Sequence, residues 1–159
     1  ALGGLDDTGL IFTMPNADAD GRGLFRQIND FCAQHPQARA YTSLGQLRYL
    51  SCIRHVDGVI GNSSSGLTEV PSFHKGTVNI GDRQRGRLRA ASVIDCAADR
   101  ASILNSIGTL FSPSFQASLP SVKNPYGSGG ASEAVVKYLE TTSFENLLKK
   151  SFVMLSVNQ

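Results

Sequence analysis

The chain has 159 residues, of which 41% are apolar and 18% charged, and its formal net charge is +2. This size and composition predict one globular domain over residues 1–159 and leave too little chain for two. The balanced charge argues against a protein whose whole surface binds nucleic acid, although basic residues cluster between Lys75 and Arg89. With no apolar run near the roughly 18 residues of a membrane span and no signal-peptide profile, we expect no membrane partner.

The chain carries three widely spaced cysteines, Cys32, Cys52 and Cys96, within apolar patterns. Their odd number and spacing fit neither a disulfide framework nor a zinc site, so we expect reduced thiols in a cytoplasmic protein. The three histidines stand apart from one another, and we predict no metal site and no cofactor. The first residue is Ala1 rather than Met, which favours a piece of a longer protein.

Short β-type runs alternate with helical periodicities along the chain, the pattern that builds a parallel sheet covered by helices. In chain order we predict a strand over residues 9–14, a helix over 22–35, a strand over 38–42, a helix over 44–53 capped by Ser43, a strand over 58–61, a helix over 65–74, strands over 77–80 and 92–95, a helix near 103–111, a loop over 112–130, a helix over 131–139 and an amphipathic segment over 144–152. Residues 143–159 are expected to form a C-terminal helix and tail. The fold class is therefore α/β.

Three predicted strand-to-helix loops carry polar residues, namely PNADADGR, YTSLG and GNSSSGLTE. Ligands of open α/β sheets bind at such loops, beyond the carboxyl ends of the strands. In the third loop, backbone N–H groups at the start of the following helix would face a ligand together with the hydroxyls of Ser63 and Ser64. Gly66 would let the backbone approach closely, so this loop suits a phosphate or diphosphate.

Helix capping is an equal alternative for the serines, because Ser is a favoured cap and turn residue in any protein. Glu69, one predicted turn further, shifts the balance towards a ligand, since its carboxylate can accept hydrogen bonds from two vicinal hydroxyls such as those of a ribose. A solvated first-turn glutamate is the simpler interpretation of the same residue.

Four arginines follow the predicted strand over residues 77–80 at alternate positions. Arg83 is nearest to the carboxyl end of that strand, and its guanidinium group matches phosphate oxygens. Arg85, Arg87 and Arg89 are interpreted as solvated, which is the commoner fate of such a run. A nucleic-acid site is disfavoured because no aromatic residues are interleaved with the arginines.

The segment GNSSSGLTEVPSFHKGTVNIGDRQRGR, with PNADADGR before it and NPYGSGGAS after it, closely resembles the C-terminal half of the hydrolysing UDP-N-acetylglucosamine 2-epimerases of capsule and sialic-acid biosynthesis. The serine triplet followed by Glu-Val resembles the hydrolysing branch rather than the non-hydrolysing one, which has DSGGxQEE at this loop. The resemblance implies the second, Rossmann-like domain of a two-domain GT-B enzyme. Homo-oligomerisation of the intact enzyme is left open.

Seven residues match family positions that surround UDP. They are Asn16, Asp18, Ser43, Ser63, Ser64, Glu69 and Arg83. Ser128 stands where many relatives have an aspartate, so that residue's role does not carry over. The family's acidic residues that act on the sugar ring would precede Ala1, and the catalytic residues are therefore unknown here.

The reaction that the resemblance implies is elimination of UDP from UDP-N-acetylglucosamine, followed by addition of water to give N-acetylmannosamine. The donor-binding domain of a GT-B glycosyltransferase and a non-enzymatic nucleotide-binding module remain open as alternatives. In each case the expected ligand is a nucleotide sugar or UDP, and the remaining partner is the chain's own N-terminal domain.

Overall fold

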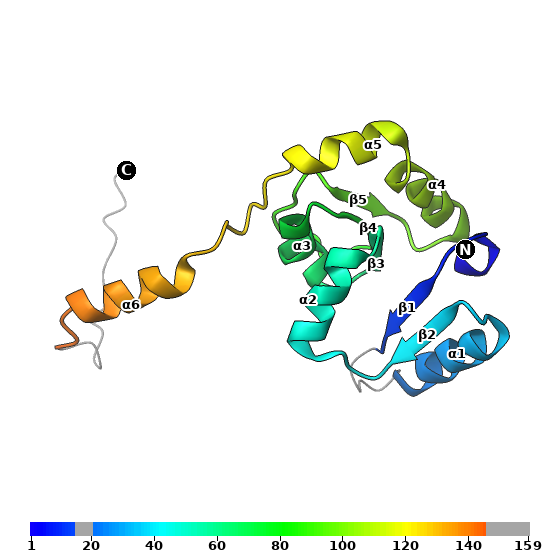
Figure 1. Ribbon diagram of the computed structural model, residues 1–159, viewed down its shortest axis with the longest axis horizontal. Helices are drawn as coiled ribbons and strands as arrows, with labels where there is room; N and C mark the ends of the chain where they lie inside the picture. The colour runs from blue at the N-terminus through cyan, green and yellow to red at the C-terminus, as the bar shows by residue number, and fades with distance from the viewer. Residues whose placement is uncertain (15–20, 146–159) are drawn as a thin grey trace, which may run out of the picture. The chain divides into compact units, whose positions relative to one another are not determined.

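A computed structural model describes residues 1–14 and 21–145 (Figure 1). The chain divides into two compact units, Ala1–Gly127 and Ser128–Gln159. The first unit holds all the described strands, and the second holds helix α6 (Ala131–Thr141), which confirms the helix predicted there. The segment predicted over residues 144–152 lies almost wholly outside the described residues.

In the first unit, strands and helices alternate as the sequence predicts. They are β1 (Leu10–Thr13), α1 (Gly21–Gln34), β2 (Ala38–Tyr41), α2 (Gly45–His55), β3 (Gly58–Gly61), α3 (Ser65–Thr68), β4 (Gly76–Ile80), β5 (Val93–Cys96), α4 (Arg100–Leu110) and α5 (Pro113–Ser118). Three single-turn 3₁₀ helices complete the unit. They are η1 (Leu2–Gly4), η2 (Val70–Phe73) and η3 (Leu119–Ser121).

All strand pairs among the described residues are parallel. β1 pairs with β2, with Leu10 opposite Ala38, while β3, β4 and β5 form a three-stranded sheet in that order (Figure 1). Parallel neighbours need long crossovers, which α1 supplies between β1 and β2, α3 and η2 supply between β3 and β4, and a segment without a helix supplies between β4 and β5. The α/β class with a Rossmann-like arrangement of parallel strands and flanking helices is confirmed, and the strands are divided between two sheets.

The hydrophobic core surrounds β4, the central strand of the larger sheet. Val78 of β4, Leu67 of α3 and Leu110 of α4 are fully buried. Leu110 packs directly over the two glycines that open β3 and β4, because a Cβ atom at Gly58 would lie 2.7 Å from its Cδ2. The glycines that begin these two strands therefore let α4 lie close against the sheet.

The helix predicted over residues 65–74 is shorter in the structure. α3 ends at Thr68 and the chain continues as the 3₁₀ helix η2, which Pro71 enters near its start. Proline lacks an N–H group and clashes with the preceding turn, so a continuous α-helix through this segment is excluded. With only one α-helical turn behind the serines, the helix dipole that we expected to act on a ligand is correspondingly short.

The loop predicted over residues 112–130 was wrong for its first half, which folds as α5 and η3. Ser112 caps α5 by accepting a hydrogen bond from the Phe115 N–H group at 3.3 Å, and Pro113 occupies the first helical position. Serine followed by proline is a helix-start signal, because proline's missing N–H is not needed there. The serine and proline content of the segment suggested a loop instead.

Candidate functional site

Most of the predicted site residues follow a parallel strand in the sequence, whereas Gly66 lies within α3 and Glu69 follows it. Asn16 and Asp18 follow β1 and lie outside the described residues. Ser43 follows β2, is exposed, and accepts a hydrogen bond from the Gly45 N–H group at 3.2 Å where α2 begins. The prediction that Ser43 caps this helix was wrong, because the capping position is Leu44 and no side chain caps the helix; the Ser43 hydroxyl accepts only from the first helical residue.

The serine triplet lies between β3 and α3 and makes a tight turn. The Ser63 carbonyl oxygen accepts from the Gly66 N–H group at 3.2 Å, and the Ser64 carbonyl accepts from the Thr68 N–H group at 3.0 Å. The Ser63 side chain is exposed and that of Ser64 is half-buried. The Ser63 hydroxyl accepts from the Ser65 N–H group at 3.4 Å, and both serines follow the carboxyl end of β3.

Ser65, the third serine, has a different role. Its hydroxyl lies 2.6 Å from the Tyr49 hydroxyl on α2, and this hydrogen bond joins α2 to α3. Burial raises the pKa of Tyr49, and the nearby Glu69 carboxylate raises it further, while the hydrogen bond with Ser65 works in the opposite direction.

Gly66 is buried against β4. A Cβ atom there would lie 2.7 Å from the methyl carbon of Thr77, and the Thr77 hydroxyl donates to the Gly66 carbonyl oxygen at 2.9 Å. Close packing on β4 is thus a sufficient reason for a glycine at this position. It also fixes the first turn of α3 to the central strand.

The arginine run follows β4 through Gly81, whose φ of +74° lets the chain turn sharply. Arg83, Arg85 and Arg87 are exposed. We had interpreted Arg89 as solvated. In the structure its Nε atom instead forms an ion pair with an oxygen of Asp95 at 2.8 Å. Arg89 therefore has a partner within the protein. Arg83, the arginine nearest to β4 in the sequence, remains the candidate for binding an anion.

Sequence reasoning missed Gln84, which lies between Arg83 and Arg85. Its side chain is 4% exposed, and its Nε2 atom donates to the Asn62 carbonyl oxygen at 2.8 Å. The serine loop and the arginine loop are therefore joined by a hydrogen bond. A polar residue between two charged ones gives no sequence signal of burial.

The NPYG segment, recognised only through the resemblance, forms hydrogen bonds with the two segments next to the predicted site. The Asn124 amide donates to the Thr68 carbonyl oxygen at 2.8 Å and to the Ser72 hydroxyl at 2.7 Å. Two residues later, the Tyr126 hydroxyl donates to the Leu88 carbonyl oxygen at 3.2 Å. This strap contacts both the helical segment after the serines and the arginine loop.

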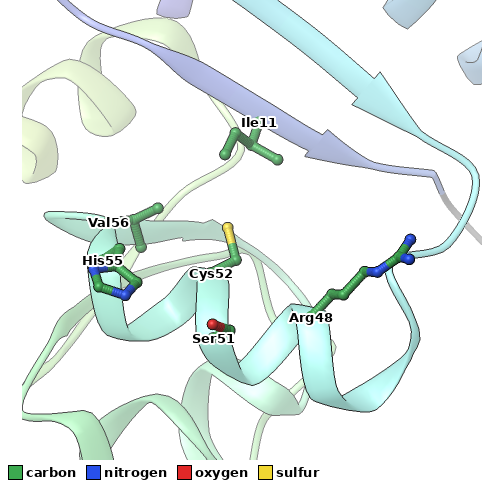
Figure 2. A pocket seen from close by; sticks show the side chains of 6 residues that line it. All are labelled: Ile11, Arg48, Ser51, Cys52, His55 and Val56. Atoms are coloured by element: carbon green, nitrogen blue, oxygen red, sulfur yellow. The ribbon is translucent and has the colours of Figure 1, made fainter.

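A cavity of about 440 Å³ lies elsewhere, between β1 and α2. Figure 2 shows Ile11 extending from β1 towards Cys52 and Val56. The cavity is lined by Ile11, Arg48, Ser51, Cys52, His55 and Val56. None of the predicted site residues lines it, so we separate it from the candidate site.

Within residues 1–14 and 21–145, no group of three or more His, Cys, Asp or Glu side chains is placed to hold a metal ion. The three cysteines are free and half-buried. His74 lies with its Nδ1 atom 3.2 Å from the Leu119 carbonyl oxygen, a contact that joins η2 to η3. The predicted site residues themselves carry amide, hydroxyl, carboxylate and guanidinium groups.

Comparison with known proteins identifies the family of the chain. The family model described as UDP-N-acetylglucosamine 2-epimerase matches residues 1–140. The chain belongs to this epimerase family. The match covers every described strand, the serine loop and the arginine loop.

Three curated relatives of the epimerase-family chain have informative names. The polysialic acid biosynthesis protein P7 of Escherichia coli is 41% identical over 116 residues, covering 73% of this chain and 29% of the relative. The GDP/UDP-N,N'-diacetylbacillosamine 2-epimerase (hydrolyzing) of Campylobacter jejuni is 41% identical over 92 residues, covering 57% of this chain and 24% of the relative. The UDP-N,N'-diacetylbacillosamine 2-epimerase (hydrolyzing) of Legionella pneumophila is 34% identical over 134 residues, covering 83% and 34%.

The chain thus spans between about a quarter and a third of the length of these relatives. Among its described helices, none combines the length and apolar character required to cross a membrane.

Proposed function

We propose that this chain is the UDP-binding domain of a hydrolysing UDP-N-acetylglucosamine 2-epimerase of sialic-acid or capsular polysaccharide biosynthesis. The observation that carries the proposal is the hydrogen bond between Gln84 and the Asn62 carbonyl oxygen at 2.8 Å. It brings the loop that presents Ser63 and the loop that presents Arg83 together at one sheet edge in a chain of the epimerase family. The free thiols agree with the cytoplasmic location that we expect.

In this proposal, Ser63, Ser64 and Arg83 bind the diphosphate. Hydroxyl donors and a guanidinium group are suited to phosphate oxygens, and both kinds of group are at the surface here. Gly66 contributes by letting α3 pack on β4, as its contact with the Thr77 methyl carbon indicates.

Glu69 is assigned to the ribose hydroxyls. It is half-buried and follows the last residue of α3. A carboxylate that is partly screened from water forms stronger hydrogen bonds with hydroxyl donors than a fully solvated one does. Asn16, Asp18 and Ser43 complete the proposed UDP site on the strength of the resemblance.

The reaction gives this domain a defined task. A base removes the proton at C2 of the sugar, the bond from C1 to the diphosphate oxygen breaks, and its electron pair leaves with UDP. Water then adds to the unsaturated sugar, which yields N-acetylmannosamine. Preorganised donors at the leaving diphosphate can contribute roughly 3 to 4 kcal/mol each, by analogy with oxyanion-hole deletions. We assign the base to the epimerase's N-terminal domain.

The names of the relatives differ in the sugar that they specify, since two name diacetylbacillosamine. The groups assigned here contact only the UDP portion, so they serve either sugar. We propose UDP-N-acetylglucosamine as the substrate, and a comparison of product release from the two UDP-sugars by the intact enzyme tests this choice.

Calorimetry with UDP, UMP and uridine tests the assignment of the site. The chain is expected to bind UDP most tightly, and Glu69→Gln is expected to weaken UDP binding by roughly 1 to 3 kcal/mol, the range for losing a charged hydrogen-bond partner. Arg87→Ala is the matched control, because Arg87 is an exposed charged residue of the neighbouring loop. Equal affinity for uridine and UDP would remove the diphosphate from the proposal, and a larger loss with Arg87→Ala would show that the assignment of residues is wrong.

A further inference from the structure

Gln84 is the most deeply buried polar side chain of the arginine loop, at 4% exposure. Its Nε2 atom donates to the Asn62 carbonyl oxygen at 2.8 Å, and its Oε1 atom accepts no hydrogen bond from the described residues. Both partners of this hydrogen bond are chain neighbours of proposed ligand-binding residues: Asn62 precedes Ser63, and Gln84 follows Arg83.

The backbone of Gln84 also has a hydrogen-bond partner. Its carbonyl oxygen accepts from an Nη atom of Arg89 at 3.3 Å, and Arg89 pairs through Nε with Asp95 at 2.8 Å. The other oxygen of Asp95 accepts from the side-chain amide of Asn79 at 2.6 Å. A continuous chain of polar contacts thus runs from β4 and β5 through the arginine loop to the loop after β3.

We propose that Gln84 is a positioning residue, which fixes the serine loop relative to Arg83 so that the diphosphate donors are preorganised. The inference rests on the proposed function of the site. Gln84 does not itself contact the ligand in this proposal, since the unpartnered Oε1 atom is inaccessible to solvent. Its effect is to reduce the ordering cost when the two loops bind one anion.

Replacement by methionine separates positioning from stability. Gln84→Met keeps a similar length and removes both the donor to Asn62 and the unpartnered buried Oε1 atom. Removing an unpaired buried polar atom offsets the lost hydrogen bond, so we expect little change in melting temperature. The variant lacks the direct hydrogen bond between the two loops while the Gln84 carbonyl oxygen can still accept from Arg89, and the diphosphate should be recognised less well.

Gln116→Met is the matched control. Gln116 also donates a side-chain Nε2 hydrogen bond to a backbone carbonyl, that of Leu110 at 2.6 Å, on α5. We expect Gln116→Met to lower the melting temperature without changing selectivity between UDP and uridine. Gln84→Asn, which keeps the amide on a side chain one carbon shorter, is the second variant at the site if Gln84→Met does not fold.

The measurement is the ratio of the uridine and UDP dissociation constants for each variant, determined by calorimetry alongside melting temperatures. The expected result is a roughly tenfold fall of this ratio in Gln84→Met, a smaller fall in Gln84→Asn and no change in Gln116→Met. An unchanged ratio in a folded Gln84 variant overturns the positioning role while the wild-type ratio still supports the UDP site. A wild-type chain that binds uridine and UDP equally overturns both proposals.

Discussion

The two sheets of the first unit differ in how their loops are held. In the larger sheet, β4 is buried along four of its five residues, and the loops after β3 and β4 are joined by Gln84. In the smaller sheet, β1 alternates between half-buried and exposed residues, and Ile11 is 50% exposed. The hydrogen bonds of its neighbouring side chains are local: Arg39 donates to the Pro36 carbonyl oxygen at 2.6 Å, and Ser43 accepts from Gly45.

The difference bears directly on the proposed site. Donors that a diphosphate needs from the larger sheet are fixed by contacts between distant segments, such as Asn124 with Thr68. Ser43, on the smaller sheet, is fixed only by its own turn. Preorganised donors cost less to order when a ligand binds, so we assign the larger share of the diphosphate affinity to the loops after β3 and β4.

The largest expected effect comes from the core of the better-packed sheet. Leu110→Ala should lower the free energy of unfolding by about 2 to 5 kcal/mol, because Leu110 is fully buried and packs over the first residues of β3 and β4. Leu47→Ala is the control, since Leu47 on α2 is 84% exposed, and it should change the free energy of unfolding by less than about 0.5 kcal/mol.

Chemical denaturation followed by circular dichroism measures both Leu variants. A loss in Leu47→Ala equal to that in Leu110→Ala would show that the exposed face of α2 is covered in solution. The difference in packing between the larger and the smaller sheet would then not account for stability.

A smaller effect is expected from the strap at Asn124. Asn124→Ala removes the donor to the Thr68 carbonyl oxygen and the Ser72 hydroxyl, and it also removes the acceptor for the Tyr126 N–H group at 2.9 Å. We expect a loss of roughly 1 to 3 kcal/mol in the free energy of unfolding. Asn29→Ala in α1 is the control, because Asn29 is exposed and alanine favours a helix. Equal melting temperatures for the two variants would show that the strap does not hold the site.

The sequence predicted the parts of the fold that depend on local pattern. The short apolar run of β3 and the stripe of α4 were recognised because burial dictates their composition. The end of the α-helix before Pro71 and the start of α5 at Pro113 both have a proline signal in the sequence. We nevertheless predicted a longer helix at the first position and a loop at the second.

The candidate site was predictable only where chemistry coincides with position after a strand, as at Ser63 and Arg83. Gln84 and Asn124 act on carbonyl oxygens of distant segments, and any backbone carbonyl can be such a partner. Their roles therefore depend on the tertiary arrangement, which leaves no pattern in the amino-acid sequence.

The smallest expected effect concerns Tyr49, which connects α2 to the serine loop through its 2.6 Å hydrogen bond with Ser65. Burial raises the pKa of Tyr49 above its ordinary value of 10.0, so the folded chain holds the phenol proton more tightly than the unfolded chain does. The stability that this provides is complete below pH 10 and is lost as the pH rises through the pKa of the folded state. Tyr49→Phe should cost about 1 kcal/mol at neutral pH and should show a smaller alkaline loss.

Tyrosinate absorbance can follow this titration, because the chain has four tyrosines and no tryptophan. A tyrosine titration with a raised pKa should be present in the wild-type chain and absent from Tyr49→Phe, and Tyr138→Phe is the control because Tyr138 is 66% exposed. If Tyr49→Phe and the wild-type chain lose stability in parallel above pH 10, Tyr49 is not protected by burial. In that case the contacts of α2 would resemble those of the smaller sheet rather than those of the larger sheet. The serine loop would then lack one of the contacts that we assign to its preorganisation.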